Sequence, residues 1–121
     1  GPLEYGLTIF GGKSGEYPQK LYKALMNSQT VLTVWDDARL VGLIRVLDDS
    51  EMLAQIHYVL VHPEYQGQGI AGRMVEYIKE KYKNFMYLEL MPEDKNNVPF
   101  YEKHGFHVME NGAAMQICNI N

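Results

Sequence analysis

The chain has 121 residues, which is enough for one domain with a single hydrophobic core. Charged residues make up 21%, and the formal net charge of −4 argues against a nucleic-acid binder, which normally carries a basic surface. No apolar run reaches about 18 residues, so no membrane-spanning helix is expected. The single cysteine, Cys118, excludes an internal disulfide and fits a reducing cytoplasm.

The N-terminal part of the chain predicts a helix followed by a β-hairpin. Gly1-Pro2 resembles the remnant of a protease site, and the glycine-rich segment after it shows no clear first strand. Residues 17–28 carry apolar side chains at helical spacing, with Pro18 in the first turn. Residues 30–35 and 40–47 are rich in β-branched and apolar residues and flank a polar turn, so we expect a hairpin there.

The middle of the chain predicts a strand, a helix and a second strand. Residues 54–61 form an apolar, strand-like run that ends at His62-Pro63. The helix after the glycine-rich turn has a core-facing stripe, and a strand at residues 85–91 follows it. The stripe consists of Ala71, Met74, Val75, Ile78 and Tyr82. The two strands should be parallel, with a right-handed connection.

The C-terminal part predicts a short helix and a second hairpin. Asn97 is expected to cap the helix, and Gly105 is expected to end it. Asn111-Gly112 lies between two apolar stretches and predicts a type I′ turn. Cys118 would then be a buried, inert thiol in the last strand. Together the elements predict an α/β or α+β domain over residues 1–121, built around a mixed sheet.

The most informative segment is the glycine-rich turn before the central helix. Gly67, Gly69 and Gly72 lack Cβ atoms, so a ligand can approach the main chain closely. The first turn of a helix leaves backbone N–H groups without partners, and the helix dipole adds positive charge there. A strand, a glycine turn and a helix N-terminus therefore predict a binding site for phosphate.

Two motifs in this order resemble the GNAT superfamily, the Gcn5-related N-acetyltransferases. The strand IHYVLVHPEY runs into Gln66-x-x-Gly69-x-Ala71, which looks like the family's acetyl-CoA signature Q/R-x-x-G-x-G/A. About thirty residues later, FYEKHGF at residues 100–106 looks like its C-terminal element. The resemblance covers roughly residues 21–118 and implies a central mixed sheet flanked by helices.

The resemblance implies that acetyl-CoA is the acyl donor and assigns residues to it. The main chain of Val59, Leu60 and Val61 would pair with the pantetheine arm, and the Val59 N–H would polarise the thioester carbonyl. The family often has an asparagine where this chain has Asp94; Asn96 and Asn97 are nearby, either could replace its contact, and Asn97 is the one assigned to the cofactor. The residues expected to hold the pyrophosphate are Gln66, Gly67, Gln68, Gly69, Ile70, Ala71 and Gly72.

The resemblance also implies catalytic roles. Tyr101 would be the general acid that protonates the coenzyme A thiolate. His57 would be the general base, because it stands where a catalytic histidine lies in one branch of the family. Gln55 occupies the position of a glutamate base in other members, and a glutamine cannot accept the proton. Glu89 is the alternative, either as the base or as a group that attracts a cationic substrate.

These residues predict an N-acetyltransferase that acts on a primary amine of a small molecule by direct transfer in a ternary complex. The alternatives are a non-catalytic acyl-CoA-binding or regulatory module and a protein or peptide N-acetyltransferase. No metal is expected, because the three other histidines and the one cysteine form no convincing ligand set. The family also implies that the chain can form a homodimer, while no nucleic-acid or membrane partner is expected.

Overall fold

The computed structural model describes residues 3, 6 and 16–120. The sequence predicts a protease-site remnant at Gly1-Pro2 and no clear first strand in the segment after it. Both segments lie outside the described residues. The chain divides into two compact units, Gly1–Leu90 and Met91–Asn121, and each is described by itself.

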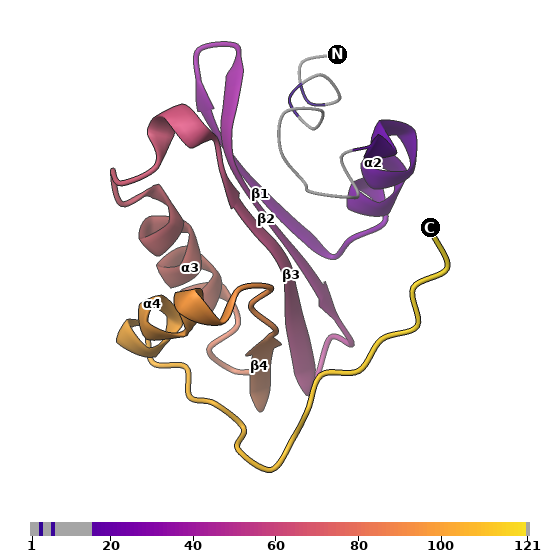
Figure 1. The fold of residues 1–121 in the computed structure, drawn as a ribbon, viewed down its shortest axis with the longest axis vertical. Coiled ribbons are helices and arrows are strands. Elements are labelled where there is room, and N and C mark those ends of the chain that lie inside the picture. The colour runs from indigo at the N-terminus through magenta and orange to yellow at the C-terminus, as the bar shows by residue number, and fades with distance from the viewer. Residues whose placement is uncertain (1–2, 4–5, 7–15, 121) are drawn as a thin grey trace. The chain divides into compact units, whose positions relative to one another are not determined.

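The described part of the first unit contains a four-stranded sheet and two main helices (Figure 1). The strands lie in the order β1-β2-β3-β4; the first three are antiparallel, and β3 and β4 are parallel. This arrangement confirms the mixed sheet and the parallel strand pair that the sequence predicts. The elements are α2 (Pro18–Met26), β1 (Thr30–Asp36), β2 (Arg39–Asp48), β3 (Leu53–Val61), η2 (Pro63–Tyr65), α3 (Ile70–Lys81) and β4 (Tyr87–Leu90).

Helix α3 packs closely on one face of the sheet because β2 has a glycine beneath it. A Cβ atom at Gly42 would lie 3.1 Å from both Ile70 Cγ2 and Met74 Sδ. The predicted stripe of α3 is largely confirmed: four of its members are buried, and Ala71 is half-buried. The four buried members are Met74, Val75, Ile78 and Tyr82.

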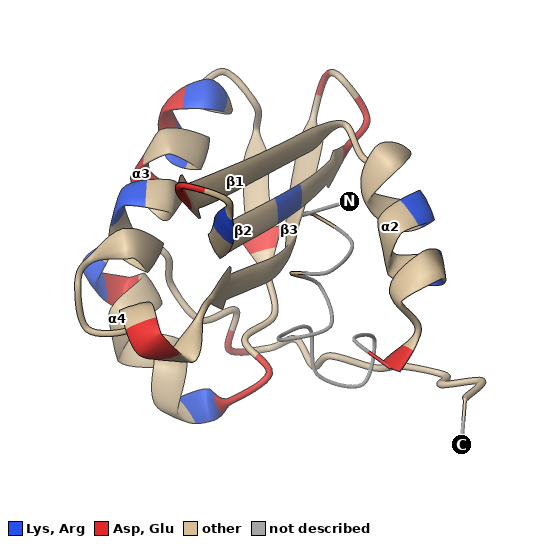
Figure 2. Cartoon of the chain, turned by 90° about the horizontal axis from the view of Figure 1, so that it is seen from above, with Lys and Arg blue, Asp and Glu red and all other residues tan. Residues whose placement is uncertain are grey.

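Helix α2 covers part of the opposite face, so the sheet lies between the two helices (Figure 2). Its buried side chains, Leu21 and Leu25, form a cluster with Leu40 and Leu43 of β2. Tyr58 and Leu60 of β3 pack against this cluster. Leu43 faces α2 whereas the adjacent Gly42 faces α3, as expected from the alternation of side chains along a strand.

The pairing of β2 and β3 is irregular at one point, and the residue there is not a glycine. Ile44 pairs with Val59 and Arg45 pairs with His57, which leaves Tyr58 as an extra residue in β3. Tyr58 has a φ angle of 74°, in the left-handed region that side chains other than glycine rarely adopt. This is a β-bulge, which bends a strand and changes the directions of the groups after it.

A hydrogen-bond network joins the C-terminal end of α3 to the sheet. The Tyr82 hydroxyl donates to Asp48 Oδ2 at 2.6 Å and lies 2.7 Å from Thr30 Oγ1. Burial and the bond to Asp48 raise the pKa of Tyr82, so the folded state favours the neutral phenol.

The second unit contains η3 (Lys95–Asn97) and α4 (Val98–Lys103). Asn97 precedes α4 as predicted, but its side chain makes no capping bond. Instead, the Asp94 side chain accepts a hydrogen bond from the Asn96 N–H at 2.9 Å, which caps η3. The side-chain cap therefore lies at the start of η3, and α4 itself has none.

The FYEKHGF segment ends α4 with a Schellman motif. Gly105 has a φ angle of 92°; its N–H donates to the Glu102 carbonyl, and the Phe106 N–H donates to the Tyr101 carbonyl at 3.1 Å. The rings of Tyr101 and Phe106 lie 5.9 Å apart, which supplies the hydrophobic contact typical of this motif. The prediction that Gly105 ends the helix is confirmed.

The predicted C-terminal hairpin is wrong for the residues that the structure describes. Residues 107–120 contain no strand, although a turn forms where the Gly112 N–H donates to the Met109 carbonyl at 3.1 Å. Cys118 is exposed, so the prediction of a buried thiol is also wrong. The physical reason is that a local turn alone does not hold two strands together, since an isolated two-stranded hairpin is marginally stable in water.

Candidate active site

Strand β3 is paired on both sides along its first half only. Its register with β4 begins at Leu53 and ends where Ile56 faces Leu90. Beyond that point, within the part of the chain that is described, Val59 and Val61 have a partner strand only on the β2 side. The second half of β3 therefore offers an open strand edge.

The main-chain groups at this edge have defined directions. The His62 N–H donates to the Val41 carbonyl of β2 at 2.8 Å. Because N–H groups alternate along an extended strand, the Leu60 N–H also faces β2, and those of Val59 and Val61 face the open edge. The Gln66 side chain donates to the Val61 carbonyl at 3.3 Å, which agrees with this direction.

The bulge at Tyr58 sets this pattern. One extra residue in β3 shifts the alternation, so the residues after it present different groups to the edge than an unbroken ladder would. The left-handed conformation of Tyr58 costs energy that its packing against the α2 cluster offsets. The sequence gives no sign of it, because a glycine is the usual signal of such a conformation and none is present.

The glycine-rich turn joins the end of β3 to α3 and leaves space around its main chain. Gly67 and Gly69 have φ angles of 81° and 83°, and a Cβ on either would meet no heavy atom within 4 Å. Gly69 caps α3, with its carbonyl accepting from the Arg73 N–H at 3.1 Å. The predicted pyrophosphate residues thus form an exposed loop (Gln66, Gly67, Gln68 and Gly69) and a half-buried first helical turn (Ile70, Ala71 and Gly72).

Tyr65 ties this turn to the β1–β2 hairpin. Its hydroxyl donates to Asp36, and the Arg39 guanidinium lies 5.9 Å from its ring centroid. Arg39 also pairs with Glu64 at 2.7 Å. The hydrogen bond to Asp36 raises the pKa of Tyr65. Sequence reasoning missed this contact, because it joins residues that are 29 positions apart.

His57 is held by an arginine that the sequence does not single out. Arg45 Nη1 lies 2.6 Å from His57 Nδ1. A guanidinium only donates, so Nδ1 accepts, and the proton of the neutral ring is on Nε2. His57 can therefore take up a proton at Nδ1 only when Arg45 leaves that atom. Its role as general base stays a prediction, and it requires that Arg45 release Nδ1.

Glu89 and Gln55 lie next to each other in the register of β3 and β4. Gln55 is exposed and Glu89 is half-buried. Among the described residues, no Lys or Arg forms an ion pair with Glu89. The structure thus brings Glu89 into the same row of side chains as His57, and its role as an alternative base stays a prediction.

Tyr101 and Asn97 belong to the second unit. Burial raises the pKa of Tyr101, so its phenol keeps its proton at neutral pH. Asn97 is exposed. The roles of both residues stay predictions.

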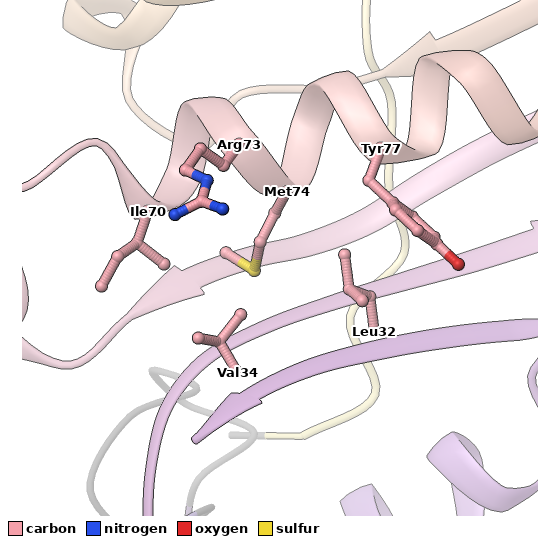
Figure 3. Close-up of a pocket in the computed structure, with 6 residues that line it drawn as sticks. All are labelled: Leu32, Val34, Ile70, Arg73, Met74 and Tyr77. Atoms are coloured by element: carbon pink, nitrogen blue, oxygen red, sulfur yellow. The ribbon is translucent and has the colours of Figure 1, made fainter. Parts of the chain in front are cut away.

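A separate pocket of about 240 Å³ lies between α3 and β1 (Figure 3). Its lining is largely apolar, with the Arg73 guanidinium and the Tyr77 hydroxyl as its polar groups. Of the predicted cofactor residues, only Ile70 contributes to it; the full lining is Leu32, Val34, Ile70, Arg73, Met74 and Tyr77. It lies along α3, whereas the predicted donor site follows β3 and the glycine-rich turn.

The described residues contain neither a metal-binding cluster nor a membrane-spanning helix. No group of three or more His, Cys, Asp or Glu side chains is placed to hold a metal ion. No helix in this part of the chain is long and apolar enough to cross a membrane.

Comparisons with known proteins agree with the motifs. An uncharacterized N-acetyltransferase, ycf52-like, from Prochlorococcus marinus is 28% identical over 99 residues, or 78% of this chain and 55% of the relative. The chain therefore spans about half the length of that curated relative. A probable acetyltransferase of unknown function from meticillin-resistant Staphylococcus aureus has a crystal structure that is 30% identical, with a TM-score of 0.84 over 97% of this chain and 93% of that one.

The fold also recurs in a more distant structure. A GNAT family acetyltransferase from Elizabethkingia anophelis, solved with acetyl-CoA bound, is 20% identical, with a TM-score of 0.63 over 75% of this chain and 62% of that one. The family model for the acetyltransferase (GNAT) family matches residues 7–106. With most of its length matched, both motifs present and the expected mixed sheet, the chain belongs to the GNAT family of acetyltransferases.

Proposed function

We propose that this protein transfers an acetyl group from acetyl-CoA to a primary amine of a small molecule, by direct transfer in a ternary complex. The observation that carries the proposal is the open edge of β3, where the N–H groups of Val59 and Val61 face away from β2. A strand edge of this kind can pair with an extended ligand that carries amide groups.

The order of the groups along β3 fits a long donor with phosphate at one end. Val61 lies at the end of the strand that leads into the glycine-rich turn, and Val59 lies two residues further back. The two N–H groups are roughly 7 Å apart along the strand. The pyrophosphate would bind at the turn, the pantetheine amides near Val61, and the thioester carbonyl at the Val59 N–H. The acetyl-CoA bound to the E. anophelis family member supports this choice of donor.

The remaining chemistry concerns protons. The ammonium of the acceptor must lose two protons, its nitrogen bonds to the acetyl carbon, and the carbon–sulfur bond breaks. Tyr101, protonated at neutral pH, would donate one proton to the leaving thiolate. One proton then passes to solvent for each acetyl group transferred. His57 (released from Arg45) or Glu89 would take up the proton of the attacking amine.

The contact between Arg45 and His57 favours one alternative. If the guanidinium holds Nδ1 permanently, the histidine cannot act as a base. Unless Glu89 takes over that role, the protein would then bind acyl-CoA without transferring the acetyl group. The test must therefore separate binding from turnover.

The experiment measures coenzyme A release and acetylated product with a panel of small primary amines, and the affinity for coenzyme A by calorimetry. Tyr101→Phe should lower kcat by about 100-fold or more, because a general acid is lost, while the affinity for coenzyme A stays the same. Tyr17→Phe, which removes an exposed hydroxyl, should change neither value. Coenzyme A binding without acetyl transfer to any amine would contradict the proposal and support a binding module.

A further inference from the structure

Four polar side chains form a row across the face of the sheet that α2 only partly covers. Arg45 of β2 pairs with His57 of β3, and Gln55 of β3 pairs with Glu89 of β4. Cross-strand partners share a face, and residues two apart on one strand do so as well. Leu43 lies two residues before Arg45 and packs under α2, which places the row on the α2 face.

Arg45 is a half-buried cation with donors to spare. Its Nε donates to Ser28 Oγ at 2.8 Å, and its Nη1 donates to His57 Nδ1 at 2.6 Å. A guanidinium has five N–H donors, so three are not used by these contacts. No carboxylate among the described residues forms an ion pair with Arg45. Burial lowers the pKa of Arg45, a cost that an anion beside it would reduce.

Part of this arrangement has a structural explanation. Ser28 follows α2, and its hydroxyl donates to the Ala24 carbonyl at 2.7 Å. A cation near the C-terminal end of a helix is also favoured by the helix dipole. These contacts account for the position of Arg45 and for its Nε group. They do not use the Nη2 group, and they provide no negative charge.

Glu89 lies at the other end of the row. Two strand spacings and a two-residue offset place its backbone roughly 12 Å from that of Arg45. Both side chains stand on the same face, and the structure gives no ion pair between them. The row thus has a positive end, a negative end and two neutral polar side chains between them. It borders Tyr58 and Val59, the start of the open edge where the thioester carbonyl is proposed to bind.

We propose that the acceptor is an amine that also carries a carboxylate, with the carboxylate bound by Arg45 and the ammonium directed toward Glu89. This inference rests on the proposed function, because it names the substrate class of the same site. Arginine is suited to the role, since two parallel N–H groups can bind both oxygens of a carboxylate. A polyamine would place a second cation against Arg45 and would be a poor acceptor.

The test uses ω-amino acids of increasing chain length, each compared with the corresponding ω-amino amide. The two members of a pair differ in charge but hardly in size. In the longer pairs, the acid group no longer alters the basicity of the amine. We expect kcat/KM for the best acid to exceed that for its amide by about tenfold or more, because a charged hydrogen bond is lost in the amide.

Variants assign the preference to Arg45. Arg45→Gln should bring the acid-to-amide ratio of kcat/KM to about one, because any change that acts through His57 affects both substrates alike. Arg45→Lys should keep part of the preference. Lys79→Gln removes a cation from the exposed face of α3 and should leave both substrates unchanged. Equal losses for the acid and the amide in Arg45→Gln would show that Arg45 only supports the fold, and would overturn the inference.

A binding measurement keeps the inference separate from the proposed function. The N-acetylated ω-amino acids and their amides are titrated into the protein saturated with coenzyme A. Tighter binding of the acids, lost in Arg45→Gln, would support the carboxylate site even if no amine were acetylated, in which case the proposed function alone would fail. Equal binding of the acids and amides would overturn the carboxylate site, even if acetyl transfer to other amines were observed.

Discussion

The two halves of β3 belong to one strand but have different surroundings. Residues 54–56 pair with both β2 and β4, and Ala54 and Ile56 are buried. Residues 57–61 contain the bulge at Tyr58, and Val59 and Val61 there are paired, among the described residues, only with β2. The first half holds the sheet together, whereas the second half exposes main-chain donors to a ligand. One strand thus serves both stability and binding.

Helix α3 shows the same division. Its C-terminal end is bound to the sheet through the Tyr82 network, in which the hydroxyl contacts two strands. Its N-terminal end follows Gly67 and Gly69, which have open space beside them. The paired half of β3 and the bound end of α3 form a structural end of the first unit; the open edge and the glycine-rich turn form a functional end. The following changes test this division, in order of expected effect.

Ile56→Ala should lower the free energy of unfolding by about 2–5 kcal/mol, because it leaves a cavity where a buried side chain was. Activity per folded molecule should change little. The measurement is chemical denaturation, with Val61→Ala as the matched change in the open half, where the side chain is only half-buried and the loss should be smaller. Equal losses at the two positions would show that the halves do not differ in this way.

Replacing the amide between Tyr58 and Val59 by an ester removes one N–H and keeps every side chain. We expect kcat to fall about 100- to 1,000-fold, as for the loss of an oxyanion donor, with little change in stability. The same replacement before Leu60 removes an N–H that faces β2, so it should cost about 1 kcal/mol of stability and spare kcat. The opposite result would mean that the bulge directs these groups differently.

Gly69→Ala should weaken binding of coenzyme A by about tenfold, because a left-handed alanine costs roughly 1–2 kcal/mol and the turn will shift to relieve it. Calorimetry measures the affinity. Gly42→Ala serves as the contrast: its Cβ would press on Ile70 and Met74, so it should lower the melting temperature first. An unchanged affinity in Gly69→Ala would show that the turn does not bind the ligand.

Tyr82→Phe should cost about 1 kcal/mol of stability and leave activity unchanged, because it removes the bonds to Asp48 and Thr30 at the structural end. The pH dependence has a definite sign. The folded state raises the pKa of Tyr82 above its unfolded value near 10, so this stabilisation is complete below about pH 10 and is lost as pH rises through the folded value.

The measurement is denaturation between pH 8 and pH 11 for both proteins. The decline of stability above about pH 10 should be shallower in Tyr82→Phe than in the unchanged chain. Identical slopes would show that the network does not depend on the phenol proton.

Local sequence patterns correctly predicted the features that depend on neighbouring residues alone. The apolar stripe of α3, the alternating strands and the stop at Gly105 follow from spacing and from backbone preferences, and the structure agrees with them. The bulge at Tyr58 could not be read from IHYVLV, because it depends on how β3 fits against β2 and α2. The contact between Arg45 and His57 joins two strands and likewise has no local signal.

The C-terminal hairpin is the reverse case, in which a local signal is present but the predicted strands do not form. Asn111-Gly112 is a strong local signal, and a turn does form there, but no strands flank it among the described residues. A turn residue fixes a direction of the chain, whereas a strand also needs a partner along its edge.

The exposure of Cys118 makes the protein convenient for spectroscopy. As the one thiol of the chain, it can be labelled selectively with a maleimide dye or a nitroxide without removing any other cysteine. Its position in the segment after α4 means that the label would report on the second unit, far along the chain from the glycine-rich turn. Titrating acetyl-CoA against the signal of such a label would reveal whether the C-terminal segment responds when the donor binds.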